Sequence, residues 1–130
     1  MSDSHKILVV EDNDFVRMQI VKFLADDGYE TLESSRGDEA VQMVLDHKDL
    51  AMAIVDVRME PVDGFDFIRT LHGRDIHLPV ILVTGDDNPD LLAQSGKLGV
   101  AAVLMKPVEK DRLIKTVDRT IQMHLRKAEG

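Results

Sequence analysis

The stretch KILVVED, residues 6–12, decides the fold of this chain. Its consecutive aliphatic residues predict a buried strand of a parallel sheet, and two acids follow at the carboxyl end of that strand. A second apolar run, 53–55, ends in the same way at Asp56. The carboxyl ends of the strands of an open α/β sheet border the crevice in which ligands bind. We therefore expect Glu11, Asp12 and Asp56 to lie in one crevice.

Three neighbouring carboxylates repel one another, so their approach costs free energy unless a cation lies between them. A hard, oxygen-preferring cation such as Mg²⁺ suits such a site, and Mg²⁺ is the expected cofactor. Two further strand ends carry suitable side chains. The hydroxyl of Thr84 can donate to an oxyanion, and the ammonium of Lys106 can offset charge on a phosphoryl group. This set predicts a metal-assisted phosphoryl site in which an aspartate attacks phosphorus.

Length and composition are consistent with one small domain. The chain has 130 residues, of which 44% are hydrophobic, and its formal net charge is -8. That charge argues against binding of nucleic acid by this domain alone, because a phosphate backbone would be repelled. The absence of cysteine excludes disulfides and thiolate metal sites. No apolar stretch suggests a signal peptide or a membrane span, so the expected location is the cytoplasm and no membrane contact is expected.

Apolar runs alternate five times with amphipathic stretches, which predicts a (βα)₅ fold. The expected strands are 7–10, 30–34, 52–55, 79–84 and 101–105, and the expected helices are 14–26, 38–46, 63–72, 89–98 and 109–127. Strand 30–34 alternates in polarity and should be an edge, whereas the other four read as covered on both faces. Expected N-caps are Asp14, Asp38, Asp63 and Asn88. The domain should span 6–127, between tails at 1–5 and 128–130.

At this point the chain resembles the response-regulator receiver domain of two-component signalling. The resemblance covers 6–127 and rests on five positions in the family's order, which are Glu11-Asp12, Asp56, Asp63-Gly64, Thr84 and Lys106-Pro107. It implies a flavodoxin-like, doubly wound α/β fold. The five-stranded parallel sheet should have the order 2-1-3-4-5, with helices on both faces.

The resemblance also implies a role for each residue. The Mg²⁺ ligands would be Glu11, directly or through water, Asp12, Asp56 and the backbone carbonyl of Arg58. Asp56 would be the phosphoacceptor, taking a phosphoryl group from a phosphohistidine or a small phosphodonor, while Thr84 and Lys106 neutralise charge and act as the switch. The domain would catalyse only its own phosphorylation and dephosphorylation, so it is not expected to be an enzyme for foreign substrates.

The implied partners are a sensor histidine kinase or a histidine phosphotransfer protein. A downstream output domain or target protein, and a homodimer, are further possibilities. The last helix carries an apolar stripe at Leu113, Val117, Ile121 and Leu125 over a stretch longer than packing on the sheet requires. It could begin a linker, form a dimer face or fray, and we favour a domain excised from a longer protein over a free-standing one.

Two positions depart from the family's pattern. Glu60 stands where a proline is usual, and Pro61 follows one residue later. Val103 stands where the family usually has a tyrosine or phenylalanine whose rotation reports phosphorylation. Output should therefore use backbone shifts at 85–88, packing changes, occlusion or dimerisation. We also expect Arg58 and Asp86 to form an ion pair across the mouth of the site and to prolong the lifetime of the phosphoryl group.

Two other interpretations remain open, and a third, a flavin site, is disfavoured. A haloacid-dehalogenase-type hydrolase would use similar chemistry, but it needs Asp-x-Asp after the first strand, and residues 11–14 read EDND. A degenerate receiver could serve only as a docking module. A flavin site would need a phosphate loop rich in Ser, Thr and Gly, which the acidic residues here replace. The five histidines lack metal-ligand spacing and are expected at the surface or in structural roles, and Met18, Met43 and Met123 are expected to fill the core.

Overall fold

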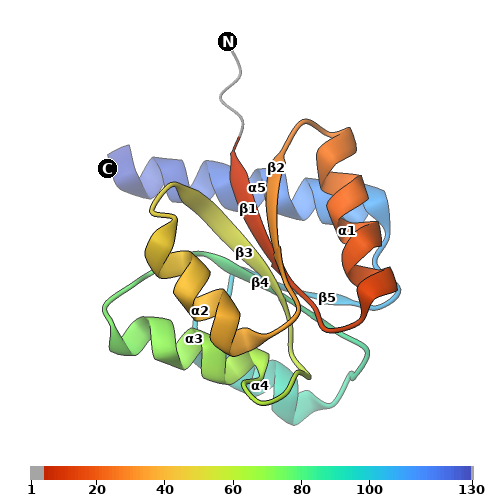
Figure 1. Ribbon diagram of the computed structural model, residues 1–130, viewed down its shortest axis with the longest axis vertical. Helices are drawn as coiled ribbons and strands as arrows, with labels where there is room; N and C mark the ends of the chain where they lie inside the picture. Colours follow the sequence, from red (N-terminus) through yellow and green to blue (C-terminus); the bar gives the residue numbers. More distant parts are fainter. Residues whose placement is uncertain (1–4, 130) are drawn as a thin grey trace.

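Strands and helices alternate strictly along the chain (Figure 1). The computed structural model describes residues 5–129, and the side chains among them as far as Leu125. The strands are β1 (Lys6–Val10), β2 (Glu30–Ser34), β3 (Leu50–Asp56), β4 (Val80–Thr84) and β5 (Ala102–Met105). The helices are α1 (Asp14–Asp26), α2 (Gly37–Asp46), α3 (Gly64–Gly73), α4 (Pro89–Lys97) and α5 (Lys110–Glu129). This is the (βα)₅ pattern that the apolar runs predict.

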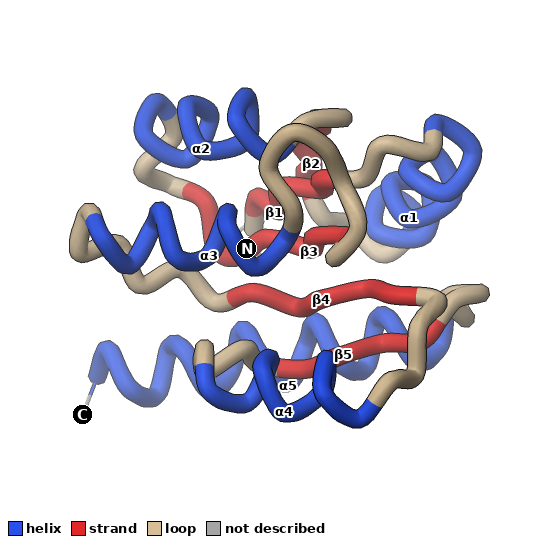
Figure 2. Tube along the Cα trace, turned by 90° about the horizontal axis from the view of Figure 1, so that it is seen from below, coloured by secondary structure: helices blue, strands red, loops and turns tan. Residues whose placement is uncertain are grey.

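The five strands form one parallel sheet in the order β2-β1-β3-β4-β5, as the resemblance implied. Figure 2 shows the strands one above another in this order. The pairing Val10 with Val55 and Asp56 with Val83 brings the carboxyl ends of β1, β3 and β4 to one edge of the sheet. The acids that follow β1 and the acid that ends β3 are therefore neighbours in space.

Alternate residues of the central strands enter two separate cores. Leu8, Ala53 and Leu82 pack with α2, α3 and α4 on one face of the sheet. Ile54 and Ile81 belong to the other core, which includes residues of α1 and α5. Because both faces of β1, β3 and β4 are covered, their sequences are apolar without alternation. β2 is half exposed at one edge, as its alternating pattern predicted.

The second edge strand is less covered than its sequence suggested. Ala102 and Val103 of β5 are only partly buried, and Met105 is 42% exposed. Met18 and Met123, expected in the core, are also exposed, so that prediction was wrong for these two side chains. An apolar side chain on a short amphipathic helix does not by itself show which side of the helix faces the sheet.

Two of the four expected N-caps are wrong. Asn13, rather than Asp14, caps α1 by accepting a hydrogen bond from the N–H of Val16 at 3.0 Å. α2 begins at Gly37 with no side-chain cap, and Asp38 lies in its first turn, where Arg36 and the N–H of Glu39 bind its carboxylate. Asp63 and Asn88 cap α3 and α4 as expected.

The first strand and the last helix differ slightly from the expected ranges. β1 begins at Lys6, one residue before the expected strand, and α5 continues to Glu129, two residues past the expected end of the last helix. Residues 1–4 and 130, which belong to the expected tails, lie outside the described residues. No helix in the described part of the chain is long and apolar enough to cross a lipid bilayer.

Gly64 allows α3 to start directly against the end of β3. Its N–H donates to the carbonyl of Val57 at 2.9 Å. A Cβ atom on Gly64 would lie 2.7 Å from the backbone oxygen of Asp56 and 3.0 Å from the Cα of Val57. The missing side chain therefore lets the helix approach the backbone that carries Asp56.

We predict that Gly64→Ala lowers the free energy of unfolding by about 1–3 kcal/mol, because overpacking against backbone cannot be relieved by a side-chain rotation. The matched control is Gly73→Ala in the same helix, where a Cβ would meet no atom within 4 Å. Helix propensity should make that change stabilising by about 0.5–1 kcal/mol. Urea unfolding followed by circular dichroism measures both, and equal effects would contradict the packing argument.

Candidate functional site

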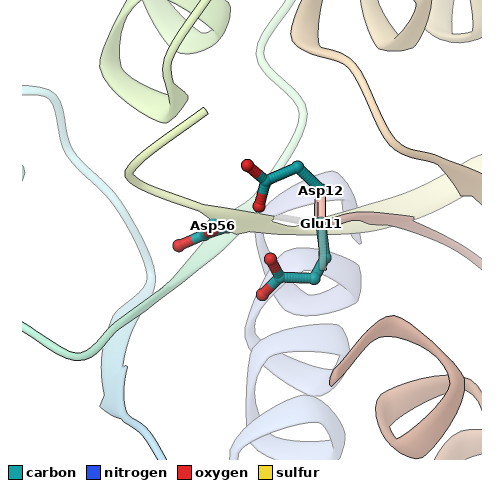
Figure 3. A group of neighbouring side chains, drawn as sticks. All are labelled: Glu11, Asp12 and Asp56. Atoms are coloured by element: carbon teal, nitrogen blue, oxygen red, sulfur yellow. The ribbon is translucent and has the colours of Figure 1, made fainter. Parts of the chain in front are cut away.

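Three carboxylates meet at the carboxyl edge of the sheet. Glu11 and Asp12 follow β1, and Asp56 is the last residue of β3. A ligand oxygen from each lies within 4.8 Å of the others, and Figure 3 shows all three carboxylates pointing to the same side. Glu11 and Asp56 are 1% and 5% exposed, whereas Asp12 is exposed. The sequence therefore identified the members of this cluster correctly.

Lys106 lies against the two buried carboxylates. Its Nζ is 2.8 Å from Oε1 of Glu11 and 3.4 Å from Oδ1 of Asp56. Burial alone would lower the pKa of Lys106, but the contact with Glu11 and the charge of Asp56 outweigh it and raise that pKa above its usual value. The ammonium is thus held charged beside the acids. Lys106 is closer to Glu11 than to Asp56, which the sequence did not indicate.

One lysine does not neutralise three acids. Partial burial, together with the neighbouring Glu11, raises the pKa of Asp12 above its ordinary value. The charged form of Asp12 is therefore disfavoured when only protein groups surround the cluster. A divalent cation between the carboxylates would remove this penalty.

The donor set fits a hard divalent cation. All three side chains offer carboxylate oxygens, which Mg²⁺ and Ca²⁺ prefer. Oε1 of Glu11 is buried beside the Lys106 ammonium at 2.8 Å, and its other oxygen accepts a hydrogen bond from the N–H of Asn13 at 3.1 Å. The N–H of Arg58 approaches Oδ1 of Asp56 at 3.4 Å, which places the backbone of Arg58 next to the cluster.

Thr84 ends β4, the neighbour of β3 in the sheet. Its side chain is buried, and its Oγ1 accepts a hydrogen bond from the N–H of Asp86 at 3.0 Å. Accepting that bond leaves the hydroxyl proton available for donation. Among the described residues Thr84 makes no hydrogen bond to the carboxylate cluster. The structure thus places it at the same edge of the sheet without joining it to the acids.

Arg58 and Asp86 form the expected ion pair. The Arg58 side chain is 73% exposed, and that of Asp86 is 27% exposed. The N–H of Asn88 donates to Asp86 and, with the Arg58 guanidinium, lowers the pKa of the Asp86 carboxyl. Both residues line a cleft of about 800 Å³ that reaches Asp12. The pair therefore shares a cleft with Asp12, the exposed member of the acid cluster.

Arg17 helps to position the acid pair, a role that the sequence did not reveal. Its guanidinium donates to the backbone carbonyl of Glu11 at 2.7 Å, to Asp14 at 2.6 Å and to Glu33 at 3.3 Å. The N–H of Glu11 in turn donates to the carbonyl of Ser34 at 3.0 Å. These bonds fix the peptide that carries the acid pair. Only the spacing of Asp14 and Arg17 on one helix gave a signal, and it indicates a local ion pair rather than a link to Glu11.

The two departures from the family's pattern differ in environment, because Val103 is packed whereas Glu60 and Pro61 are exposed. Val103 is partly buried against the core that contains α2, α3 and α4. Met59, next to Glu60, is buried in the same core, and the Glu60–Pro61 peptide is cis. The Lys106–Pro107 peptide is also cis.

The parallel sheet, with three carboxylates and a lysine at its carboxyl edge, defines a flavodoxin-like α/β protein with an acidic cluster that could hold a metal ion. The sequence profile of the response regulator receiver domain matches residues 7–118. The chain belongs to this family, whose members are phosphoacceptor signalling modules of two-component systems.

Individual relatives agree with this assignment. The chain is 30% identical over 117 residues to the transcriptional regulatory protein PdtaR of Mycobacterium tuberculosis, covering 89% of this chain and 56% of PdtaR. It is 24% identical to the chemotaxis protein CheY of Bacillus subtilis, covering 91% of this chain and 98% of CheY. A crystal structure of a response regulator receiver protein from Pseudomonas putida superposes with a TM-score of 0.82 at 30% identity, covering 92% of this chain and 99% of that one. The chain spans about half the length of PdtaR and nearly all of CheY.

We predict that Mg²⁺ raises the free energy of unfolding, by about 1.4 kcal/mol at a concentration ten times its dissociation constant. Asp12→Asn should abolish most of this gain. Without Mg²⁺ the same variant should be as stable as the parent chain or more stable, because one repelling charge is gone. Asp87→Asn, a change in a carboxylate outside the cluster, is the control and should keep the Mg²⁺ effect. Thermal unfolding with and without Mg²⁺ measures this, and a Mg²⁺ effect that survives Asp12→Asn would contradict the site.

Proposed function

We propose that Asp56 is the phosphoacceptor of this domain and that Mg²⁺ assists the transfer. The observation that carries this proposal is the meeting of three carboxylates with the Lys106 ammonium at the carboxyl edge of the sheet. The ligands of Mg²⁺ would be Asp12, Asp56 and the backbone carbonyl of Arg58, with Glu11 bound directly or through water. When bound, Mg²⁺ would neutralise charge on the phosphoryl oxygens.

Each residue then has a definite task. An oxygen of Asp56 forms the bond to phosphorus, while the bond from phosphorus to the donor breaks and its electron pair leaves with the donor. Lys106 already lies 3.4 Å from Asp56, so its charge can stabilise the product without a large movement. Thr84 can donate its free hydroxyl proton to a phosphoryl oxygen. Little acid–base work is needed, because positioning and charge provide most of the catalysis.

The partners follow from this chemistry. The donor would be a sensor histidine kinase or a histidine phosphotransfer protein, and the recipient of the signal would be an output domain or a separate target. The chain would turn over no foreign substrate beyond its phosphodonor, and it would work in the cytoplasm, where such kinases present their phosphohistidine. The chain matches 56% of PdtaR, which supports a domain attached to a further part of a longer protein. It matches 98% of CheY, which supports a free-standing domain.

We predict that incubation with acetyl phosphate and Mg²⁺ adds one phosphoryl group per chain, measured by intact mass spectrometry. Asp56→Asn should abolish the adduct, and a chelator should prevent it. Asp87→Asn should be phosphorylated like the parent chain. An adduct that persists in Asp56→Asn would contradict the assignment of the acceptor. Steady release of phosphate from several monoesters would favour a hydrolase instead, and no adduct from any donor would favour a docking module.

We further propose that the Arg58–Asp86 pair prolongs the life of the phosphoryl group. Both residues line the cleft that Asp12 also lines, so the pair would hinder a water that approaches Asp56 from this side. An exposed ion pair contributes only about 0–1 kcal/mol, so its effect on the rate should be modest.

We predict that Arg58→Ala speeds dephosphorylation by up to about fivefold, the change that corresponds to 1 kcal/mol in a barrier. The substitution removes the side chain but keeps the backbone carbonyl. Arg69→Ala is the matched control, because Arg69 lines the same cleft but contacts Asp66 instead of Asp86. Loss of the mass adduct with time gives both rates. An unchanged or slower rate in Arg58→Ala would remove the pair from the mechanism.

A further inference from the structure

A second groove lies at the end of the sheet opposite the acid cluster. Its walls are the loop between α3 and β4, the loop between α4 and β5, and the second half of α5, which approach one another at the left of Figure 2. Its volume is about 740 Å³. None of the residues that line it belongs to the phosphoryl site, so the proposed function leaves it unexplained.

Part of this groove is apolar and open to solvent. Leu98 and Val100 belong to the partly buried rim of the core beneath α4. Met123 of α5, whose side chain is 53% exposed, contributes to the opposite wall. Met123 was expected in the core but is exposed. It therefore adds an apolar surface to the groove without contributing to the core of the fold.

The polar part of the groove is basic. Arg119 and the imidazoles of His72, His77 and His124 line it, and its described lining residues include no carboxylate. The rings of His72 and His77 lie with their centroids 5.7 Å apart. One acid that does not line the groove contacts one of these imidazoles. The carboxylate of Asp75, whose side chain is 96% exposed, lies 3.0 Å from Nε2 of His77.

This basic lining is unusual for the molecule. The chain carries a formal net charge of -8, and the cleft at the phosphoryl site is lined by five acids and two arginines. In the second groove Arg119 supplies a permanent positive charge, and each neutral imidazole still offers one N–H donor. The charge of the groove is therefore complementary to an anion, whereas the net charge of the whole chain opposes anion binding.

We propose that this groove binds a small organic anion with an apolar body. The volume lies within the range of about 300–1,000 Å³ that is typical of small-molecule sites. The apolar body would pack against Met123, Leu98 and Val100, and the acidic group would lie against Arg119 and the imidazoles. The combination of mainly apolar walls with a few convergent donors is the usual composition of such sites. This inference does not depend on phosphorylation of Asp56.

The probe for this proposal is anilinonaphthalene sulfonate, an aromatic anion whose fluorescence rises when it leaves water. Phenylnaphthylamine, which has the same rings without the sulfonate, is the neutral comparison. The expected result is saturable binding of one sulfonate dye per folded chain, with weaker binding of the neutral dye. In an amide NMR titration, shifts should be confined to the two loops and to residues 116–124. Equal binding of both dyes, or shifts elsewhere, would overturn the proposal.

Two variants of α5 separate a specific site from general attraction. Arg119→Gln should weaken binding of the sulfonate dye by about fivefold to tenfold, because it removes a charged hydrogen-bond donor. Arg112→Gln removes the same charge from the same helix outside the groove and should change the affinity little. Both arginines are exposed, so both variants should fold, which circular dichroism verifies. Equal weakening in the two variants would show nonspecific electrostatic binding and would overturn the proposal.

Discussion

The convergence of three carboxylates on one edge of a parallel sheet is the constraint on which the rest of this structure depends. Parallel pairing of β1, β3 and β4 brings Glu11, Asp12 and Asp56 together whether or not their charges favour it. Lys106, at the end of β5, offsets part of the repulsion by lying against Glu11 and Asp56. Two buried cores hold the strands in this register, so the free energy of apolar burial maintains an arrangement that electrostatics alone would oppose. The fold therefore holds together three carboxylates that could receive a cation.

The fold was predictable because the signals in the sequence are local and agree with one another. Apolar runs such as Ile7–Val10 fix strands that are covered on both faces, and the alternation of 30–34 identifies an edge. The carboxyl-edge rule then places Glu11, Asp12, Asp56, Thr84 and Lys106 together from the strand ends alone. The sheet order needed the resemblance, because the sequence does not show which strand lies beside which.

The features that could not be predicted depend on the direction of side chains. Asn13 and Asp14 are both good N-cap residues, and the sequence does not show at which of them α1 starts. Arg17 reaches the carbonyl of Glu11 and the side chain of Glu33, two contacts that require the relative positions of β1, β2 and α1. The partnership of Lys106 with Glu11 likewise depends on the rotamers of two long side chains at the carboxyl ends of β5 and β1. Long polar side chains can reach several partners, so tertiary geometry selects among them.

The valine at 103 raises the question of how this domain could report phosphorylation without an aromatic side chain that turns inward. The hydrogen bonds around Thr84 offer a route. Its Oγ1 accepts from the N–H of Asp86 at 3.0 Å, and Asp86 binds both the N–H of Asn88, the N-cap of α4, and the side chain of Arg58. A rotation of Thr84 toward a phosphoryl oxygen would disturb the first of these bonds, and the other two would carry the change to the start of α4. Coupling through a contiguous set of hydrogen bonds needs no large side chain at 103, and the loop 85–88 would be the two-state element of such a switch.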